Sequence, residues 1–154
     1  MVTFPLKHRP AESYKEPPRS FRAPRDKGRL HAGCDLYAPV GTEILAMADG
    51  VVTQGKYAFY LGTFAIEIDH GEFLARYGEI RDVAPGVTEG SHVTAGQVIA
   101  YVGRLDGLNM SMLHLETNSK QAKGGLTDRN APPFQRRSDL VDPTARLDGA
   151  TLSA

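Results

Sequence analysis

The chain has a single cysteine, Cys34, no formal net charge and no long apolar run. One cysteine cannot form an intramolecular disulfide, so cysteine usage leaves the compartment open. No apolar stretch approaches the roughly 20 residues that a membrane-spanning helix needs, and we therefore expect no membrane partner. Eighteen basic residues balance eighteen acidic ones. Nucleic-acid-binding domains usually carry a basic excess, so we expect no nucleic-acid partner either.

The first residues also lack the apolar segment of a signal peptide, since the chain starts MVTFPLKHRPAESYKEPP. We therefore expect synthesis in the cytoplasm without a signal peptide. A target outside the cytoplasm, in the periplasm or cell wall, would then require release or non-classical export. The length of 154 residues suits one domain, and we expect a monomer.

The chain does contain many short β-type runs separated by glycine turns. Residues 1–28 are rich in proline and charge, which predicts an extended N-terminal arm with a solvated basic stretch. Residues 63–69 alternate as a half-buried strand does, and a turn connects them to a second run at 73–80, which predicts a hairpin. Further strands are expected at residues 43–46, 50–56, 98–103 and 112–117, and a short helical turn near 138–140. The fold class is mainly β and antiparallel, with one domain at 29–150 and a tail at 151–154.

Two histidines and one aspartate have the chemistry of a metal site. His31 and Asp35 are four residues apart, so they point to the same side of an extended chain. Neutral imidazole and carboxylate are good zinc ligands, and a catalytic zinc site uses three protein ligands and one open position. His114, inside a distant β-type run, is a candidate for the third ligand. By itself, this spacing is also compatible with ordinary hydrogen-bonded histidines.

The wider sequence around these residues resembles a known family. The stretch HAGCDLYAPVGTEILAMADGVV resembles the opening signature of lysostaphin-like, LytM-type zinc metallopeptidases, H-x-G-x-D followed by A-P-x-G-T and D-G-x-V. The later SMLHLE resembles the closing H-L-H-F-E strand of that family, and Val141-Asp142-Pro143 its D-P ending. The resemblance runs from about residue 21 to residue 147. It implies that residues 29–150 form a zinc metallopeptidase domain with a lysostaphin-like fold, in which a duplicated β motif forms a sandwich core and long loops line a groove.

Carried over residue by residue, the resemblance places the zinc ligands at His31, Asp35 and His114. Two further histidines of the family are absent, because Met112 and Glu79 occupy their positions. A thioether transfers no proton at neutral pH, so Met112 is expected only to line the cleft. A carboxylate beside a zinc-bound water can act as a general base, which makes Glu79 the candidate catalytic residue. The alternative for Glu79 is a solvated or salt-bridged carboxylate in a hairpin.

Strand alternation suggests two more contributors. Tyr77 shares parity with Glu79, so it is a second candidate catalytic residue that could hold a developing oxyanion, or else a packing residue. Glu116 shares parity with His114, so it either orients that ligand from behind or faces solvent.

The function that the resemblance implies is zinc-dependent hydrolysis of peptide bonds in bacterial peptidoglycan, in the stem peptide or the cross-bridge. A phage or prophage lysin fits this chain, and a secretion-system effector fits nearly as well. The alternative is a degenerate relative that binds the cell wall or regulates another hydrolase without catalysis. A lipoyl- or biotinyl-type carrier also uses paired short strands, but the corresponding turn Ala46-Met47-Ala48-Asp49-Gly50 has no lysine to modify.

Overall fold

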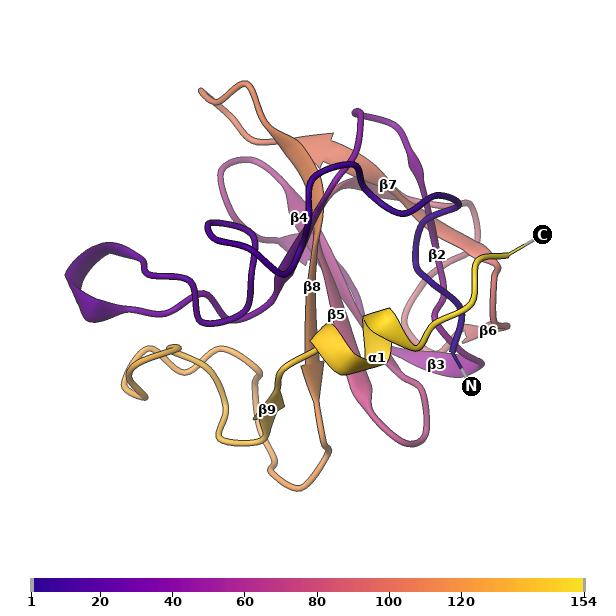
Figure 1. Cartoon of the computed structure of the whole chain (residues 1–154). Coiled ribbons are helices and arrows are strands. Elements are labelled where there is room, and N and C mark those ends of the chain that lie inside the picture. Colours follow the sequence, from indigo (N-terminus) through magenta and orange to yellow (C-terminus); the bar gives the residue numbers. More distant parts are fainter. Residues whose placement is uncertain (1, 154) are drawn as a thin grey trace.

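A curled antiparallel sheet forms the core of the protein in the computed structural model, which describes residues 2–153 (Figure 1). The strands are β1 Cys34–Tyr37, β2 Glu43–Leu45, β3 Gly50–Ala58, β4 Phe64–Asp69, β5 Leu74–Val83, β6 His92–Val93, β7 Val98–Arg104, β8 Ser111–Asn118 and β9 Leu140–Val141. Their order along the sheet is β1-β8-β7-β5-β4-β3-β6, while β2 pairs with β7, β9 with β8, and β8 also with β5. The predicted antiparallel β class is confirmed.

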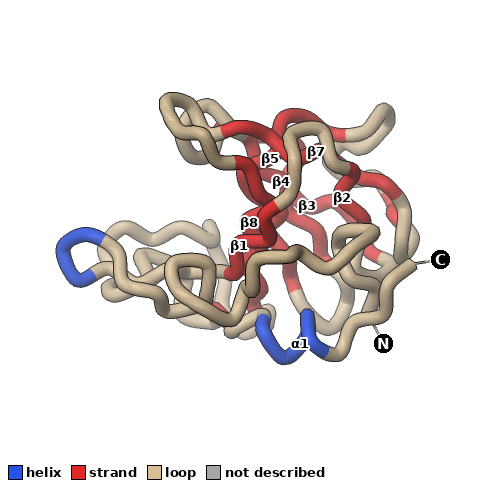
Figure 2. The backbone as a smooth tube through the Cα atoms, turned by 45° about the horizontal axis from the view of Figure 1, so that its top comes forward, coloured by secondary structure: helices blue, strands red, loops and turns tan. Residues whose placement is uncertain are grey.

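Helices are few and short (Figure 2). They are the 3-10 turn η1 Asp26–Gly28 and the helix α1 Thr144–Asp148, which begins after Pro143, a residue suited to a helix start. Among residues 2–153 no helix has the length and hydropathy to cross a bilayer. The short helical turn expected near residues 138–140 is a hydrogen-bonded turn and not a helix, since the backbone N–H of Leu140 donates to Arg137. Leu140 and Val141 then extend the sheet by pairing with Asn118 and Thr117.

The hairpin predicted from alternation is present as β4 and β5. Ile66 pairs with Tyr77 and Ile68 with Ala75, and all four side chains are buried. Strand β8 lies between β1 on one side and β5 and β7 on the other. Because β8 has strands on both sides, seven of its eight residues, Leu113 and His114 among them, are fully or nearly fully covered.

The first part of the N-terminal arm, residues 2–14, packs on the core, which corrects the expectation of a free extended arm there, whereas most of the basic stretch at 15–29 is exposed as expected. Phe4 and Leu6 are buried in the core, and Tyr14 packs beside Phe4. The backbone N–H of Thr3 donates to Met47. The backbone N–H of Phe4 donates to Thr151, and that of Thr151 donates to Val2, so both ends of the chain lie together. The prolines exclude helix here, as expected, but the apolar side chains between them supply the contacts with the core.

Candidate metal and catalytic site

His31, Asp35 and His114 converge on one point of the sheet, although His114 is 79 residues from the nearer of the other two. Strand β1 pairs with β8 so that Asp35 lies directly opposite His114. His31 precedes β1 in an extended segment, and its Nε2 lies 3.1 Å from Asp35 Oδ1 and 3.3 Å from His114 Nδ1. The remaining separation, from His114 Nδ1 to Asp35 Oδ1, is 2.9 Å. All three side chains are buried.

Gly33 allows this approach, because it lies between His31 and Asp35 where the chain passes over β8. A Cβ at residue 33 would lie 2.3 Å from the carbonyl oxygen of Leu115, far inside contact distance. Any other residue would therefore push β1 away from β8 and separate Asp35 from His114.

Each histidine is oriented by a hydrogen bond from its second ring nitrogen. His31 Nδ1 donates to the backbone oxygen of Ser20 at 2.9 Å, and His114 Nε2 donates to Glu116 Oε2 at 2.7 Å. These bonds direct the other nitrogen of each ring toward Asp35. Metal-binding histidines in proteins are commonly held by such partners.

The electrostatics of the three residues suit a cation. Burial lowers the pKa of His114, but its hydrogen bonds to Asp35 and Glu116 outweigh this effect and raise the pKa to about 10. Burial raises the pKa of Asp35, but His114 and His31 offset it and bring the pKa down to about 2. A positive charge is therefore stabilised between these carboxylates, held as a proton on His114 or supplied by a metal ion.

The donor set fits zinc. Atoms that bind zinc tetrahedrally at about 2.0–2.1 Å lie about 3.3 Å from one another. The three candidate ligand atoms are 2.9–3.3 Å apart, and they are two imidazole nitrogens and one carboxylate oxygen. This set leaves a fourth position open, as in catalytic rather than structural zinc sites.

Glu79 lies beside this triad in a strained position of β5. Phe64 pairs with Ile80 and Ala65 with Gly78, so Glu79 is an extra residue, a β-bulge, with φ of 61°. Such left-handed backbone is costly for a non-glycine residue and is enriched at functional sites. The carboxyl lines the same groove as the triad, and its Oε2 is buried without a hydrogen-bond partner. Burial raises the pKa of Glu79 to about 7.

The bulge also explains why Tyr77 is a packing residue and not the catalytic residue that was the other alternative. Alternation placed Tyr77 on the face of Glu79, but the extra residue shifts that parity by one. The Tyr77 side chain is fully buried in the core, where its hydroxyl lies 2.8 Å from His70 Nε2 and accepts the backbone N–H of Met47. It cannot reach an oxyanion at the triad. Met112, in contrast, lines the groove on the face of His114.

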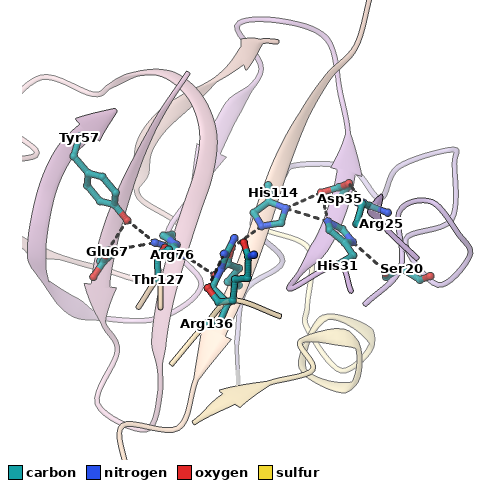
Figure 3. A network of polar contacts seen from close by, with 12 residues as sticks. Ser20, Arg25, His31, Asp35, Tyr57, Glu67, Arg76, His114, Thr127 and Arg136 are labelled. Atoms are coloured by element: carbon teal, nitrogen blue, oxygen red, sulfur yellow. Dashed lines mark hydrogen bonds and ion pairs between the residues drawn. The ribbon is translucent and has the colours of Figure 1, made fainter. Parts of the chain in front are cut away.

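A polar network around Arg76 and Arg136 lies beside His114 (Figure 3), and the buried Glu116 connects it to the ring of His114. The Glu116 side chain is completely covered, so the solvent-facing alternative is wrong. Besides His114, it accepts hydrogen bonds from Arg76 at 2.9 Å and from Arg136 at 3.0 Å. Arg76 continues the network to Tyr57 and Thr127. Sequence reasoning missed both arginines, because only the folded chain brings residues 76, 116 and 136 together.

The triad and Glu79 lie in a groove of about 840 Å³. Phe59, Tyr60, Leu105, Leu108 and Met110 line it on the side of the β3–β4 and β7–β8 turns. Residues of the segments 18–31 and 127–136 line it elsewhere.

Comparison with known proteins identifies the family. The model of Peptidase family M23 matches residues 29–125, which contain His31, Asp35 and His114. The chain belongs to peptidase family M23. The matched segment covers more than half of the protein and includes both signature stretches that carried the resemblance.

Individual relatives are more distant. Residues of this M23 chain are 29% identical over 99 positions to the peptidoglycan DD-endopeptidase ShyC of Vibrio cholerae, covering 64% of this chain and 22% of that protein. The chain thus spans about a fifth of the length of the curated relatives it matches.

Solved structures show the same fold. The peptidase lysostaphin from Staphylococcus simulans has a TM-score of 0.64 at 18% identity, covering all of this chain and 52% of that one. A zinc-containing peptidase from Vibrio cholerae has a TM-score of 0.57 at 24% identity, covering 75% of this chain and 37% of that one. The lysostaphin-like fold predicted from the resemblance is confirmed.

Proposed function

We propose that the protein is a zinc-dependent endopeptidase that hydrolyses peptide bonds of bacterial peptidoglycan. The observation that carries this proposal is the convergence of three zinc-type ligand atoms in a groove, with an unpartnered buried carboxyl beside them. Membership of peptidase family M23 supports the peptidase reaction. The substrate is supported by ShyC, which is named a peptidoglycan DD-endopeptidase, and the metal by the zinc-containing peptidase of similar fold.

His31, Asp35 and His114 would hold the metal through Nε2, Oδ1 and Nδ1. When bound there, a zinc ion would polarise the scissile carbonyl and acidify a water molecule. Glu116 keeps the Nε2 proton of His114 in place, so that Nδ1 is free to bind. Ser20 does the same for His31 through its backbone oxygen.

Glu79 moves the proton. Its free Oε2 accepts a proton from the attacking water as the water oxygen bonds to the carbonyl carbon. The protonated carboxyl then gives this proton to the amide nitrogen as the C–N bond breaks, which restores the carboxylate. A pKa near 7, raised by burial, suits a group that must both take and return a proton near neutral pH.

Met112 takes no part in proton transfer, because a thioether neither donates nor accepts a proton at this pH. It narrows the groove next to His114. Its presence at this position favours the rival proposal of a non-catalytic wall-binding relative, since it leaves Glu79 as the single proton carrier proposed beside the metal.

Digestion of purified peptidoglycan separates the two proposals. Metal-stripped protein, zinc-restored protein and the zinc-restored Glu79→Gln variant are incubated with the same walls, and the released fragments are analysed by mass spectrometry. We expect new peptide termini only with the zinc-restored wild-type protein, and a loss of about 10²–10⁴-fold in rate for Glu79→Gln. Near-normal cleavage by Glu79→Gln would remove Glu79 from the mechanism. A folded, zinc-loaded wild type that binds walls but releases no fragment would establish the rival.

The place of action follows from the substrate. We propose that the monomeric protein acts on the cell wall, as a phage-type lysin does, and lyses susceptible bacteria when added from outside. Clearing of a turbid cell suspension by wild type, with no clearing by Glu79→Gln, is the expected result. Clearing that does not depend on Glu79 would refute enzymatic lysis.

A further inference from the structure

Two loops far apart in the sequence meet at one end of the groove. They are residues 18–31, before β1, and residues 119–139, between β8 and β9, and both project to the same side of the sheet (Figures 1 and 2). The backbone N–H of Leu30 donates to Pro133 at 3.0 Å. The rings of Phe21 and Phe134 stack with their centroids 5.1 Å apart. The loops therefore form one continuous wall beside the metal triad.

Arginines are concentrated on this wall. Arg25 and Arg29 come from the first loop and Arg129 and Arg136 from the second, and all four line the groove; we call them the arginine wall. Including Arg76, the groove contains five of the twelve arginines of the chain and none of its six lysines. The acidic residues in its lining, among those the structure describes, are only Asp35 and Glu79 of the candidate site. The chain has no net charge, so this excess of arginines over acidic residues is specific to the groove.

Two of these guanidinium groups, those of Arg29 and Arg129, make no contact with the described residues that holds the fold together. Arg136 and Arg76 both neutralise Glu116, and Arg25 donates to Pro18 and lies 3.7 Å from Asp35. Within residues 2–153, neither Arg29 nor Arg129 has an ion-pair partner or a side-chain hydrogen bond. Arg29 is half-buried and Arg129 exposed, so each can reach a molecule in the groove.

The opposite side of the groove differs in chemistry. Leu108 and Met110 are exposed apolar residues there, and Tyr60 is exposed beside them. This side offers no charge to a bound peptide. A substrate crossing the triad therefore has a cationic environment on one side of the scissile bond and an apolar one on the other.

We infer that the arginine wall binds a free carboxylate of the substrate next to the bond that is cut, with Arg29 and Arg129 as its specificity-determining residues. The planar guanidinium group matches a carboxylate with two parallel hydrogen bonds, which an ammonium group cannot do. The preferred substrate is thus an acidic stem peptide rather than a neutral cross-bridge. This inference rests on the proposed endopeptidase function and selects between its two substrate classes.

The test compares two stem peptides that differ only in having free carboxylates or carboxamides. Their affinities for the zinc-loaded Glu79→Gln protein are measured by isothermal titration calorimetry, so that no turnover occurs. We expect the carboxylate peptide to bind about tenfold more tightly or better, since hydrogen bonds between charged groups are roughly twice as strong as neutral ones. The added double substitution Arg29→Gln/Arg129→Gln is expected to abolish this difference.

Lys27→Gln/Lys123→Gln is the matched control. It removes the same charge from the same two loops, but neither lysine lines the groove. We expect this control to keep the preference. Equal binding of both peptides, or binding of neither, would overturn the inference. So would a preference that survives Arg29→Gln/Arg129→Gln, because the metal itself would then be selecting the carboxylate.

Cleavage by the wild-type protein separates this inference from the proposed function. If both peptides are cut with equal kcat/KM, the endopeptidase proposal stands and the arginine wall has no role in specificity. If the carboxylate peptide binds through Arg29 and Arg129 but is never cut, the inference stands and the endopeptidase proposal fails for this substrate.

Discussion

Replacing Glu116 with glutamine should weaken zinc binding, although Glu116 does not touch the metal. Glu116 Oε2 accepts the Nε2 proton of His114 and a hydrogen bond from Arg136, and Oε1 accepts from both Arg76 and Arg136. An amide has one oxygen where the carboxylate has two. If that oxygen serves the arginines, the amide N–H₂ faces His114 and favours the tautomer whose proton is on Nδ1, the nitrogen that should bind zinc.

The magnitude follows from the number of bonds lost. Removing the partner of a metal-binding histidine typically lowers metal affinity about 10–100-fold, which corresponds to about 1.4–2.8 kcal/mol. Glu116 is fully buried with two arginines against it, so folding stability should fall as well, by about 3 kcal/mol or more. Zinc affinity is therefore measured by competition with a chelator at low temperature, with circular dichroism to show that the variant is folded.

Glu67→Gln is the matched control for this experiment. Glu67 accepts from the Tyr57 hydroxyl and lies 4.0 Å from Arg76, at the outer end of the same network, but it does not contact His114. We expect its zinc affinity to equal that of the wild type. A folded Glu116→Gln protein with a zinc Kd within twofold of wild type would refute the argument that Glu116 orients the ligand.

Three further predictions follow from the same geometry. A carboxyl with a raised pKa in the folded state destabilises the fold as the pH rises from its unfolded pKa toward the raised value. Metal-free Glu79→Gln should therefore be more stable than wild type at pH 8, by up to about 3 kcal/mol, and equally stable below pH 4. A thermal unfolding midpoint of the variant at pH 8 that is no higher than that of wild type would contradict this prediction. Gly33→Ala should separate β1 from β8 and abolish tight zinc binding. Gly125→Ala should leave zinc binding unchanged, because a Cβ there would meet only one atom, at 3.9 Å. Equal zinc affinities of the two variants would contradict this prediction. Both nitrogens of His114 face carboxylates in the metal-free protein, so zinc binding to the Glu79→Gln variant should release at least about one proton per ion. The binding enthalpy should then vary with the ionisation enthalpy of the buffer. A binding enthalpy that does not depend on the buffer would show that His114 is already neutral.

The strands and the triad could be predicted because local sequence contains the necessary signals. Alternation in residues 63–69 and the turn that follows identified β4 and β5. The four-residue spacing of His31 and Asp35 places their side chains on the same side of any extended segment. Spacing made His114 one candidate for the third ligand, and the resemblance to a known family connected it to the other two.

The features that were missed depend on long-range contacts. The bulge at Glu79 follows from how β5 pairs with both β4 and β7, so nothing in the local pattern signals that Tyr77 turns into the core. Phe4 and Leu6 are isolated apolar residues in a charged, proline-rich stretch that has no apolar pattern of its own. Their burial is visible only once the rest of the core is in place. The arginines around Glu116 come from β5 and from the β8–β9 loop, which fold together only in the native state.

The central claim is that His31, Asp35 and His114 hold one zinc ion. The most direct measurement is the zinc bound per chain, by elemental analysis after dialysis, for wild type and for His114→Ala. We predict about one ion per chain for wild type and almost none for His114→Ala, with both proteins folded. A wild-type protein that retains no more zinc than the His114→Ala variant would contradict the account.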